Sequence, residues 1–224
     1  MGVIQRQSIK QSVVSYTAIV IGLVNIAIYT ATLSRAEIGF FKFCIDTAAL
    51  ISPFVLLGSS SLNMRYFPIF KDKENGHNGF LFLMLLIPTI GLSLFGILFY
   101  FVSDQLITWY TDDTHEAYKQ YFKYIIPITI FIVYTNPFRT FSFNFQRIVV
   151  PAILNDLLIK VSIPTGAILY FFEVINYEGF IRWITVTFLL VLIGHIVYVK
   201  FLGQLHLKPD FSKLTSTLRK EMRS

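Results

Sequence analysis

Long apolar stretches alternate with short polar segments along the chain. Each apolar stretch lacks the two-residue alternation of a half-buried β-strand and runs for about 20 residues, the length of a membrane-spanning helix. The pattern predicts six such helices, at residues 12–33, 38–62, 80–102, 118–138, 148–172 and 180–202. Residues 203–224 turn polar and basic and predict a cytoplasmic tail or linker. The predicted fold class is therefore all-α, a polytopic membrane helix bundle.

The composition excludes a soluble domain. Hydrophobic residues make up 54% of the chain and charged residues only 14%, whereas an average globular protein is about 25% charged. The net charge of +6 comes from Lys and Arg in the short segments between apolar stretches. This placement is typical of membrane topology, so we expect the lipid bilayer as a partner and no nucleic acid.

The orientation follows from the positions of Lys and Arg. Thirteen of the 19 lie in the N-terminal segment, the second and fourth connections and the tail, whereas four lie in the segments on the opposite side. Positively charged loops stay in the cytoplasm. Both termini are therefore predicted to be cytoplasmic.

Four ionisable residues lie within predicted spans: Lys42, Asp46, Asp156 and Lys160. A charge at bilayer depth is costly and marks a functional site by default, so these residues are the candidates for a substrate-binding cavity. Lys160 falls near the bilayer midplane, whereas Lys42 is close enough to a span end to reach the headgroups. Each Lys is also four residues from an Asp, and ion pairing within one helix is the structural alternative.

Arg65, Arg139 and Arg147 fall at the predicted cytoplasmic ends of the second, fourth and fifth spans. Guanidinium groups bind phosphate in a bidentate manner, so these residues are the candidates for a basic mouth that attracts an anionic headgroup. The alternative is ordinary positive-inside topology. Asn25 and Asn155, within the first and fifth spans, are expected to hydrogen bond between helices.

Enzyme signatures are missing from the sequence. The four His residues show no metal-ligand spacing, so we predict no metal site. There is no phosphate-binding glycine loop and no nucleophile elbow, so we predict no catalytic residue and no cofactor. Proline interrupts four of the six predicted spans and Gly22 interrupts a fifth, which favours a bundle that bends during transport.

Four segments resemble bacterial polysaccharide biosynthesis membrane proteins, the oligosaccharide flippases of the multidrug, oligosaccharidyl-lipid and polysaccharide exporter superfamily. They are MGVIQRQSIK (1–10), RYFPIFKDK (65–73), HNGFL (77–81) and RIVVPAIL (147–154). The resemblance extends over nearly the whole chain. Members of this family have two lobes, and this sequence matches the N-terminal lobe only.

The resemblance implies transport of an undecaprenyl-diphosphate-linked oligosaccharide across the bacterial inner membrane, for O-antigen or other surface polysaccharide. It implies that the chain is a truncated half that works with a second lobe or a second copy. Lys42 and Lys160 are then the candidate cavity cations. A cation-coupled drug exporter is an alternative, with Na⁺ or H⁺ bound at Asp46 or Asp156. A non-transporting membrane scaffold is the other alternative.

Overall fold

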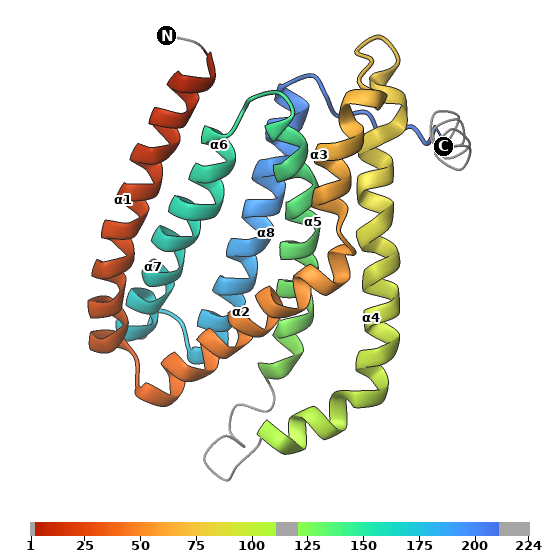
Figure 1. Ribbon diagram of the computed structural model, residues 1–224. Helices are drawn as coiled ribbons and strands as arrows, with labels where there is room; N and C mark the ends of the chain where they lie inside the picture. Colours follow the sequence, from red (N-terminus) through yellow and green to blue (C-terminus); the bar gives the residue numbers. More distant parts are fainter. Residues whose placement is uncertain (1–2, 111–120, 211–224) are drawn as a thin grey trace.

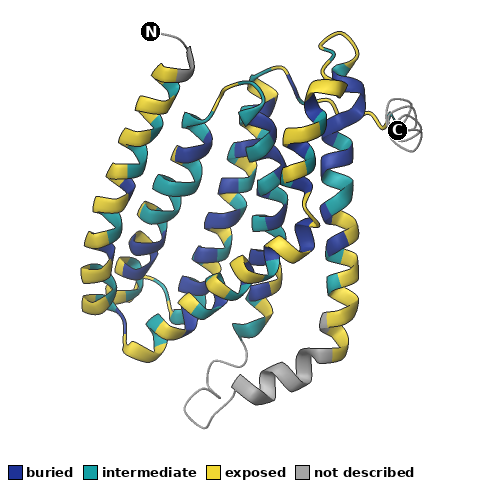
Figure 2. Cartoon of the chain, in the orientation of Figure 1, coloured by how far each residue is buried: buried dark blue, intermediate teal, exposed yellow. Residues whose placement is uncertain are grey.

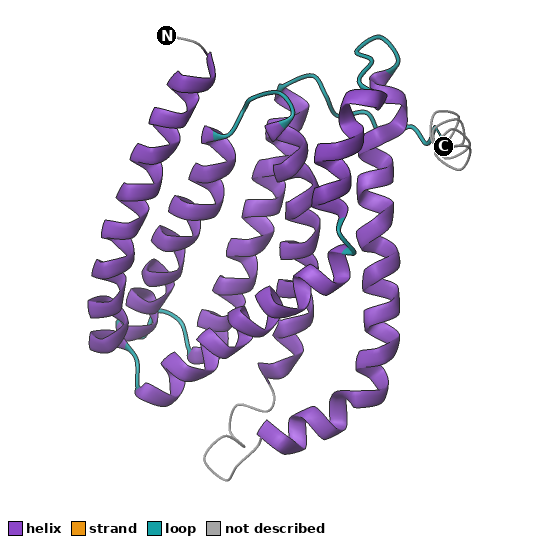
Figure 3. Ribbon diagram, in the orientation of Figure 1, coloured by secondary structure: helices purple, strands orange, loops and turns teal. Residues whose placement is uncertain are grey.

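The computed structural model describes residues 3–110 and 121–210, and its regular structure there is helical throughout (Figure 3). In chain order the α-helices are α1 (Val3–Thr32), α2 (Arg35–Leu56), α3 (Ser59–Phe70), α4 (Phe80–Tyr110), α5 (Ile125–Phe143), α6 (Val149–Ala152), α7 (Ile159–Phe171) and α8 (Tyr177–Phe201). A π-helical segment, Ile153–Leu158, joins α6 to α7 without a break. The all-α prediction is confirmed for this part of the chain.

Five helices are long and apolar enough to cross a membrane: Gln5–Thr32, Arg35–Leu56, Gly76–Leu98, Val149–Phe171 and Tyr177–Phe201. The chain is therefore a multi-pass membrane protein. The predicted fourth span, 118–138, corresponds to α5, which begins at Ile125 and extends to Phe143; residues 118–120 lie outside the described residues. Asn136 and Arg139 make the second half of α5 polar. For this reason α5 is not among the five helices that are apolar enough to cross a membrane.

Both described ends of the chain, Val3 and Asp210, lie at the same end of the bundle (Figure 1). We call this the inner end, and we call the opposite end, which holds the turn between α1 and α2, the outer end. A chain whose two ends lie on one side of a membrane crosses it an even number of times, which agrees with the six predicted spans. The assignment of the inner end to the cytoplasm remains a prediction from the Lys and Arg distribution.

The predicted second span, 38–62, is wrong as a single helix. Leu57 and Gly58 adopt left-handed backbone conformations, with φ of 47° and 76°, and separate α2 from α3. Gly58 has no Cβ and adopts this conformation without steric cost, and Pro53 has already removed one backbone N–H from the last turn of α2. As a result α2 crosses the bundle diagonally, whereas α3 runs along it toward the inner end (Figure 1).

α5 lies at the centre of the bundle and packs mainly against α2 and α8. One buried cluster in the outer half includes Phe40, Phe41, Ile128, Phe180 and Ile184. A second buried cluster, at the inner end, includes Phe67, Phe70, Phe80, Phe138 and Phe141. α1 lies at the edge and exposes most of its surface (Figure 2). The packed interior therefore joins α2, α5 and α8, and α1 is attached mainly through α7.

Candidate functional site

Lys160, on α7, is directed at α1. Its side chain is half-buried, and Nζ donates a hydrogen bond of 2.9 Å to the backbone oxygen of Ala18. Ala18 and Gly22 leave room on α1 for this contact, since a Cβ placed on Gly22 would lie 3.6 Å from Nζ. In the opposite direction, Asn25 Nδ2 donates to the backbone oxygen of Lys160 at 2.7 Å. The prediction that Asn25 bridges two helices is confirmed.

Asp156 is half-buried in the π-helical segment, four residues before Lys160. The structure shows no hydrogen bond or ion pair to its carboxylate from any described residue. The alternative of an Asp156–Lys160 ion pair is therefore wrong, because the ammonium binds the Ala18 carbonyl instead. Single π-helical turns within α-helices occur frequently at functional sites, and this one holds a carboxylate that has no partner among the described residues.

The π-helical segment is fixed to α8 through Asn155 and His195. Asn155 Nδ2 lies 3.1 Å from His195 Nε2, and His195 Nδ1 lies 2.8 Å from the backbone oxygen of Val191. Because the carbonyl only accepts, Nδ1 carries the proton and Nε2 accepts from Asn155. Asn155 therefore bridges two helices, as predicted, and His195 is a fully buried partner of that bridge.

Lys42 and Asp46 lie on the exposed side of α2. The structure records no hydrogen bond or ion pair for either side chain with any described residue, including Asp156 and Lys160. The predicted four-residue cavity therefore does not form a hydrogen-bonded cluster in the described structure. The alternative of a Lys42–Asp46 ion pair is also wrong for this structure.

The three predicted mouth arginines lie in the inner half of the bundle, and each has a different environment. Arg65, on α3, places its guanidinium 5.3 Å from the centre of the Tyr66 ring. Arg147 is exposed in the connection after α5. Arg139 is half-buried on α5, and its guanidinium lies 5.8 Å from the centre of the Phe143 ring. The Nε of Arg139 is buried and has no hydrogen-bond partner among the described residues.

A polar seam joins α3 to the inner half of α5 beside Arg139. Ser60 Oγ donates to Asn136 Oδ1 at 2.8 Å, and Asn63 Nδ2 donates to the backbone oxygen of Thr140 at 2.9 Å. Asn144 Nδ2 then donates to Asn63 Oδ1 at 2.8 Å. The sequence reasoning missed this seam. A signal was present, because Asn136, Thr140 and Asn144 recur every four residues and therefore share one helix face.

A second missed feature fixes the segment after α8 to the inner end. Four consecutive residues, Gly76–Gly79, have positive φ, and the buried His77 at φ 55° is held among Phe67, Phe141 and Phe145. His77 Nδ1 accepts from the backbone N–H of Asp72 at 3.2 Å, so Nε2 donates to Gln204 Oε1 at 2.6 Å. Non-glycine residues in this conformation each cost about 1–3 kcal/mol, and surrounding contacts must hold them in place.

An apolar cavity of about 640 Å³ opens between α2, α4 and α5. Its lining includes Ile51, Leu92, Phe95 and Ile126, and a hydrogen bond of 2.9 Å between Thr89 Oγ1 and the Tyr134 hydroxyl lies at its wall. None of the seven predicted site residues lines it. Its chemistry suits hydrocarbon and not a charged headgroup.

Comparison of this chain with protein family models, curated proteins and solved structures finds no match. The resemblance to oligosaccharide flippases therefore stays a prediction from the quoted segments. The structure adds the location of the charged groups. Arg139 lies beside the polar seam, Asp156 lies in the π-helical segment, and Lys160 lies on α7 and donates to α1. Lys42 and Asp46 lie on the exposed side of α2.

Proposed function

We propose that this chain is a lobe of a flippase that moves an undecaprenyl-diphosphate-linked oligosaccharide from the cytoplasmic to the periplasmic leaflet of a bacterial inner membrane. The proposal rests on one observation above all, the state of Arg139. A guanidinium group has five N–H donors in a planar fork, and the Nε of Arg139 is buried with no partner among the described residues. An oxygen atom from a bound anion would complete this hydrogen bonding once a movement of the helices uncovers the Nε.

The surroundings of Arg139 suit a diphosphate. Arg65, on α3, and Arg147, in the connection after α5, belong to segments in the same inner half of the bundle (Figure 1) and add positive charge along the predicted entry side. Charge-assisted hydrogen bonds between Arg and phosphate are roughly twice as strong as bonds between neutral groups. In this proposal Arg139 binds the diphosphate directly, and the polar seam fixes the helix that carries it.

The break between α2 and α3 supplies a hinge for the same process. Leu57 and Gly58 allow α3 to change its angle to α2 without disturbing the hydrogen bonds within either helix. Discontinuous helices near a binding site are common in transporters. Because α3 is bonded to α5 through the polar seam, a bend at this hinge would move the partners of Arg139.

A binding measurement tests the proposal. The chain is placed in lipid nanodiscs, and undecaprenyl diphosphate is titrated against the native chain, Arg139→Gln and Arg139→Lys. Loss of the guanidinium group is expected to weaken binding by about tenfold or more, with Lys retaining part of the affinity. Arg35→Gln is the matched control, because Arg35 is exposed at the outer end. Equal affinity in all four proteins would remove Arg139 from the site, and no binding by the native chain would favour a non-transporting scaffold.

The carboxylate of Asp156 has no partner in the part of the chain that the structure describes, which favours a second candidate function, a cation-coupled exporter of the same superfamily. A carboxylate at bilayer depth needs a proton, a metal cation or a paired base, and Lys160 is bonded elsewhere. Proton or Na⁺ uptake by the chain in liposomes, compared between the native sequence and Asp156→Asn, tests this role. Unchanged uptake in the variant would exclude Asp156 as the coupling group.

A further inference from the structure

The exposed side of α2 carries charges at a depth where lipid chains would surround it. α2 has 22 residues and is long and apolar enough to cross the membrane. Lys42 lies seven residues after its start, and Asp46 lies at its middle. Both side chains are exposed, and the structure gives neither a partner among the described residues. The long side chain of Lys42 is close enough to a span end to reach the headgroups, whereas the short side chain of Asp46 is not. Because hydrocarbon cannot solvate the charge of Asp46, we expect this side of α2 to face something other than lipid chains.

The remaining residues on this side are suited to helix packing. Gly39, Lys42, Asp46, Ala49 and Pro53 are all exposed and follow one another at spacings of three and four, so they form one stripe along the helix. We call this stripe the α2 face. A Cβ placed on Gly39 would meet nothing within 4 Å, and small residues allow the backbones of membrane helices to approach closely.

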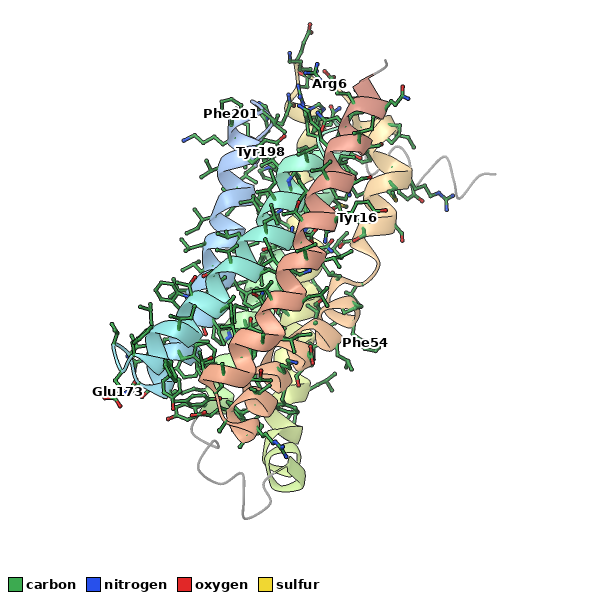
Figure 4. All side chains as sticks on the ribbon, turned by 90° about the vertical axis from the view of Figure 1, so that its left-hand side faces the viewer. Arg6, Tyr16, Phe54, Glu173, Tyr198 and Phe201 are labelled. Atoms are coloured by element: carbon green, nitrogen blue, oxygen red, sulfur yellow. The ribbon has the colours of Figure 1, made fainter. Side chains whose placement is uncertain are left out.

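Large apolar side chains flank the α2 face. Leu50 is 68% exposed and Phe54 is 73% exposed. Phe54 points away from the bundle, toward the same side as Tyr16 of α1 (Figure 4). Small residues in the centre with apolar residues beside them are typical of a surface that another helix covers.

The order of the two charges favours pairing between chains and not within one. In a helix, an acid that precedes a base by four residues pairs well, whereas the reverse order is less favourable. Here Lys42 precedes Asp46, and the structure shows no ion pair between them. The two residues lie four positions apart, about 6 Å along the helix axis. The long Lys side chain spans this distance to reach an Asp on a neighbouring helix.

We propose that the α2 face binds the α2 face of a second copy of this chain. In a two-fold dimer, residue i of each copy contacts residue j of the other, and the reverse contact follows by symmetry. Lys42 of each copy then pairs with Asp46 of its partner, so all four charges are neutralised. Both copies keep the same orientation in the membrane because the two-fold axis runs along the membrane normal. This assignment is independent of the substrate proposed for Arg139.

Disulfide cross-linking tests the contact. Cys44 is buried and is the single cysteine, so Cys44→Ala provides a background without thiols. Ala49→Cys in this background is expected to cross-link to a dimer when the membranes are oxidised. Leu190→Cys is the matched control, since Leu190 is 49% exposed near the middle of α8. Equal cross-linking at both positions, or none at position 49, would overturn the proposal.

A charge swap tests the pairing itself. Lys42→Asp and Asp46→Lys each place like charges opposite one another, and each is expected to lower the dimer association constant by about tenfold or more. The double variant Lys42→Asp/Asp46→Lys is again self-complementary and is expected to recover the dimer. If the two charges instead face a water-filled path, the single swaps leave the dimer fraction unchanged. If the swaps act only by misfolding, the double variant stays as defective as the single ones. Either result would overturn the proposal.

Discussion

Asn25 on α1 provides the hydrogen bond that Pro164 withholds from Lys160. In a regular α-helix the backbone oxygen of Lys160 would accept from the N–H of residue 164, but that residue is proline and has no N–H. The side-chain amide of Asn25 donates to this oxygen at 2.7 Å instead. In lipid, an unsatisfied carbonyl costs free energy that water cannot offset. The hydrogen bond from Asn25 therefore replaces the one that Pro164 cannot make within α7, and it also attaches α1 to α7.

Asn25→Ala is expected to destabilise the bundle by about 1 kcal/mol, because it leaves the Lys160 carbonyl without a donor. The loss should depend on Pro164. In a Pro164→Ala background, residue 164 supplies its own N–H, so the same Asn25→Ala change should lower the free energy of unfolding much less. SDS-induced unfolding in mixed micelles, followed by circular dichroism, measures all four proteins of this cycle.

Thr30→Ala is the control for the Asn25 cycle. Thr30 is exposed on the same helix, and among the described residues its hydroxyl bonds only to backbone oxygens of that helix, those of Ile26 and Ala27. Its replacement should leave the unfolding free energy nearly unchanged. Strictly additive effects of Asn25→Ala and Pro164→Ala would contradict the repair role, since groups that share one hydrogen bond show an interaction energy.

Most of the fold could be predicted from the sequence because the apolar stretches are long. Hydropathy alone located five helices to within a few residues at most boundaries. It failed between α2 and α3, where apolar side chains continue through the break and only the backbone changes, at Leu57 and Gly58. Hydropathy sums side chains and carries no information on backbone direction.

The candidate site was less predictable, because an ionisable residue within a span has several possible partners. Spacing along one helix suggested that Lys160 pairs with Asp156, but the ammonium binds a backbone oxygen of α1, 142 residues away in sequence. Asn25 gave a clearer signal, since a lone amide in a membrane helix most often bonds to another helix. The Nε of Arg139 lacks a hydrogen-bond partner among the described residues because of the way the helices pack, and no pattern along one helix predicts such packing.

The variant Lys160→Met distinguishes a structural role of Lys160 from a role in binding substrate. Methionine is similarly long and unbranched but carries no charge. Ala18 keeps the helical hydrogen bond from Gly22 when the ammonium is removed, so no backbone group loses its last partner. We expect the unfolding free energy to change by less than about 1 kcal/mol and the affinity for undecaprenyl diphosphate to stay unchanged. A loss of binding as large as that of Arg139→Gln, with stability retained, would show that Lys160 belongs to the substrate site.

The contact between α4 and the last turn of α2 depends on Gly91. A Cβ placed on Gly91 would lie 1.9 Å from the backbone oxygen of Val55, which is far too close for both atoms to keep their positions. Val55 is two residues before Leu57, where the hinge begins. The close approach therefore fixes α4 against the base of the hinge, and backbone atoms cannot yield as a side chain would.

Gly91→Ala is expected to destabilise the protein by about 1–3 kcal/mol, because the added methyl group forces α4 away from α2. Gly96→Ala on the same helix is the matched control, since a Cβ at that position meets nothing within 4 Å. Alanine favours a helix interior over glycine by about 0.5–1 kcal/mol, so the control should be neutral or slightly stabilising. Unfolding in mixed micelles compares the two variants. Because they make the same chemical change on one helix, equal stabilities would show that α4 does not need its close approach to Val55.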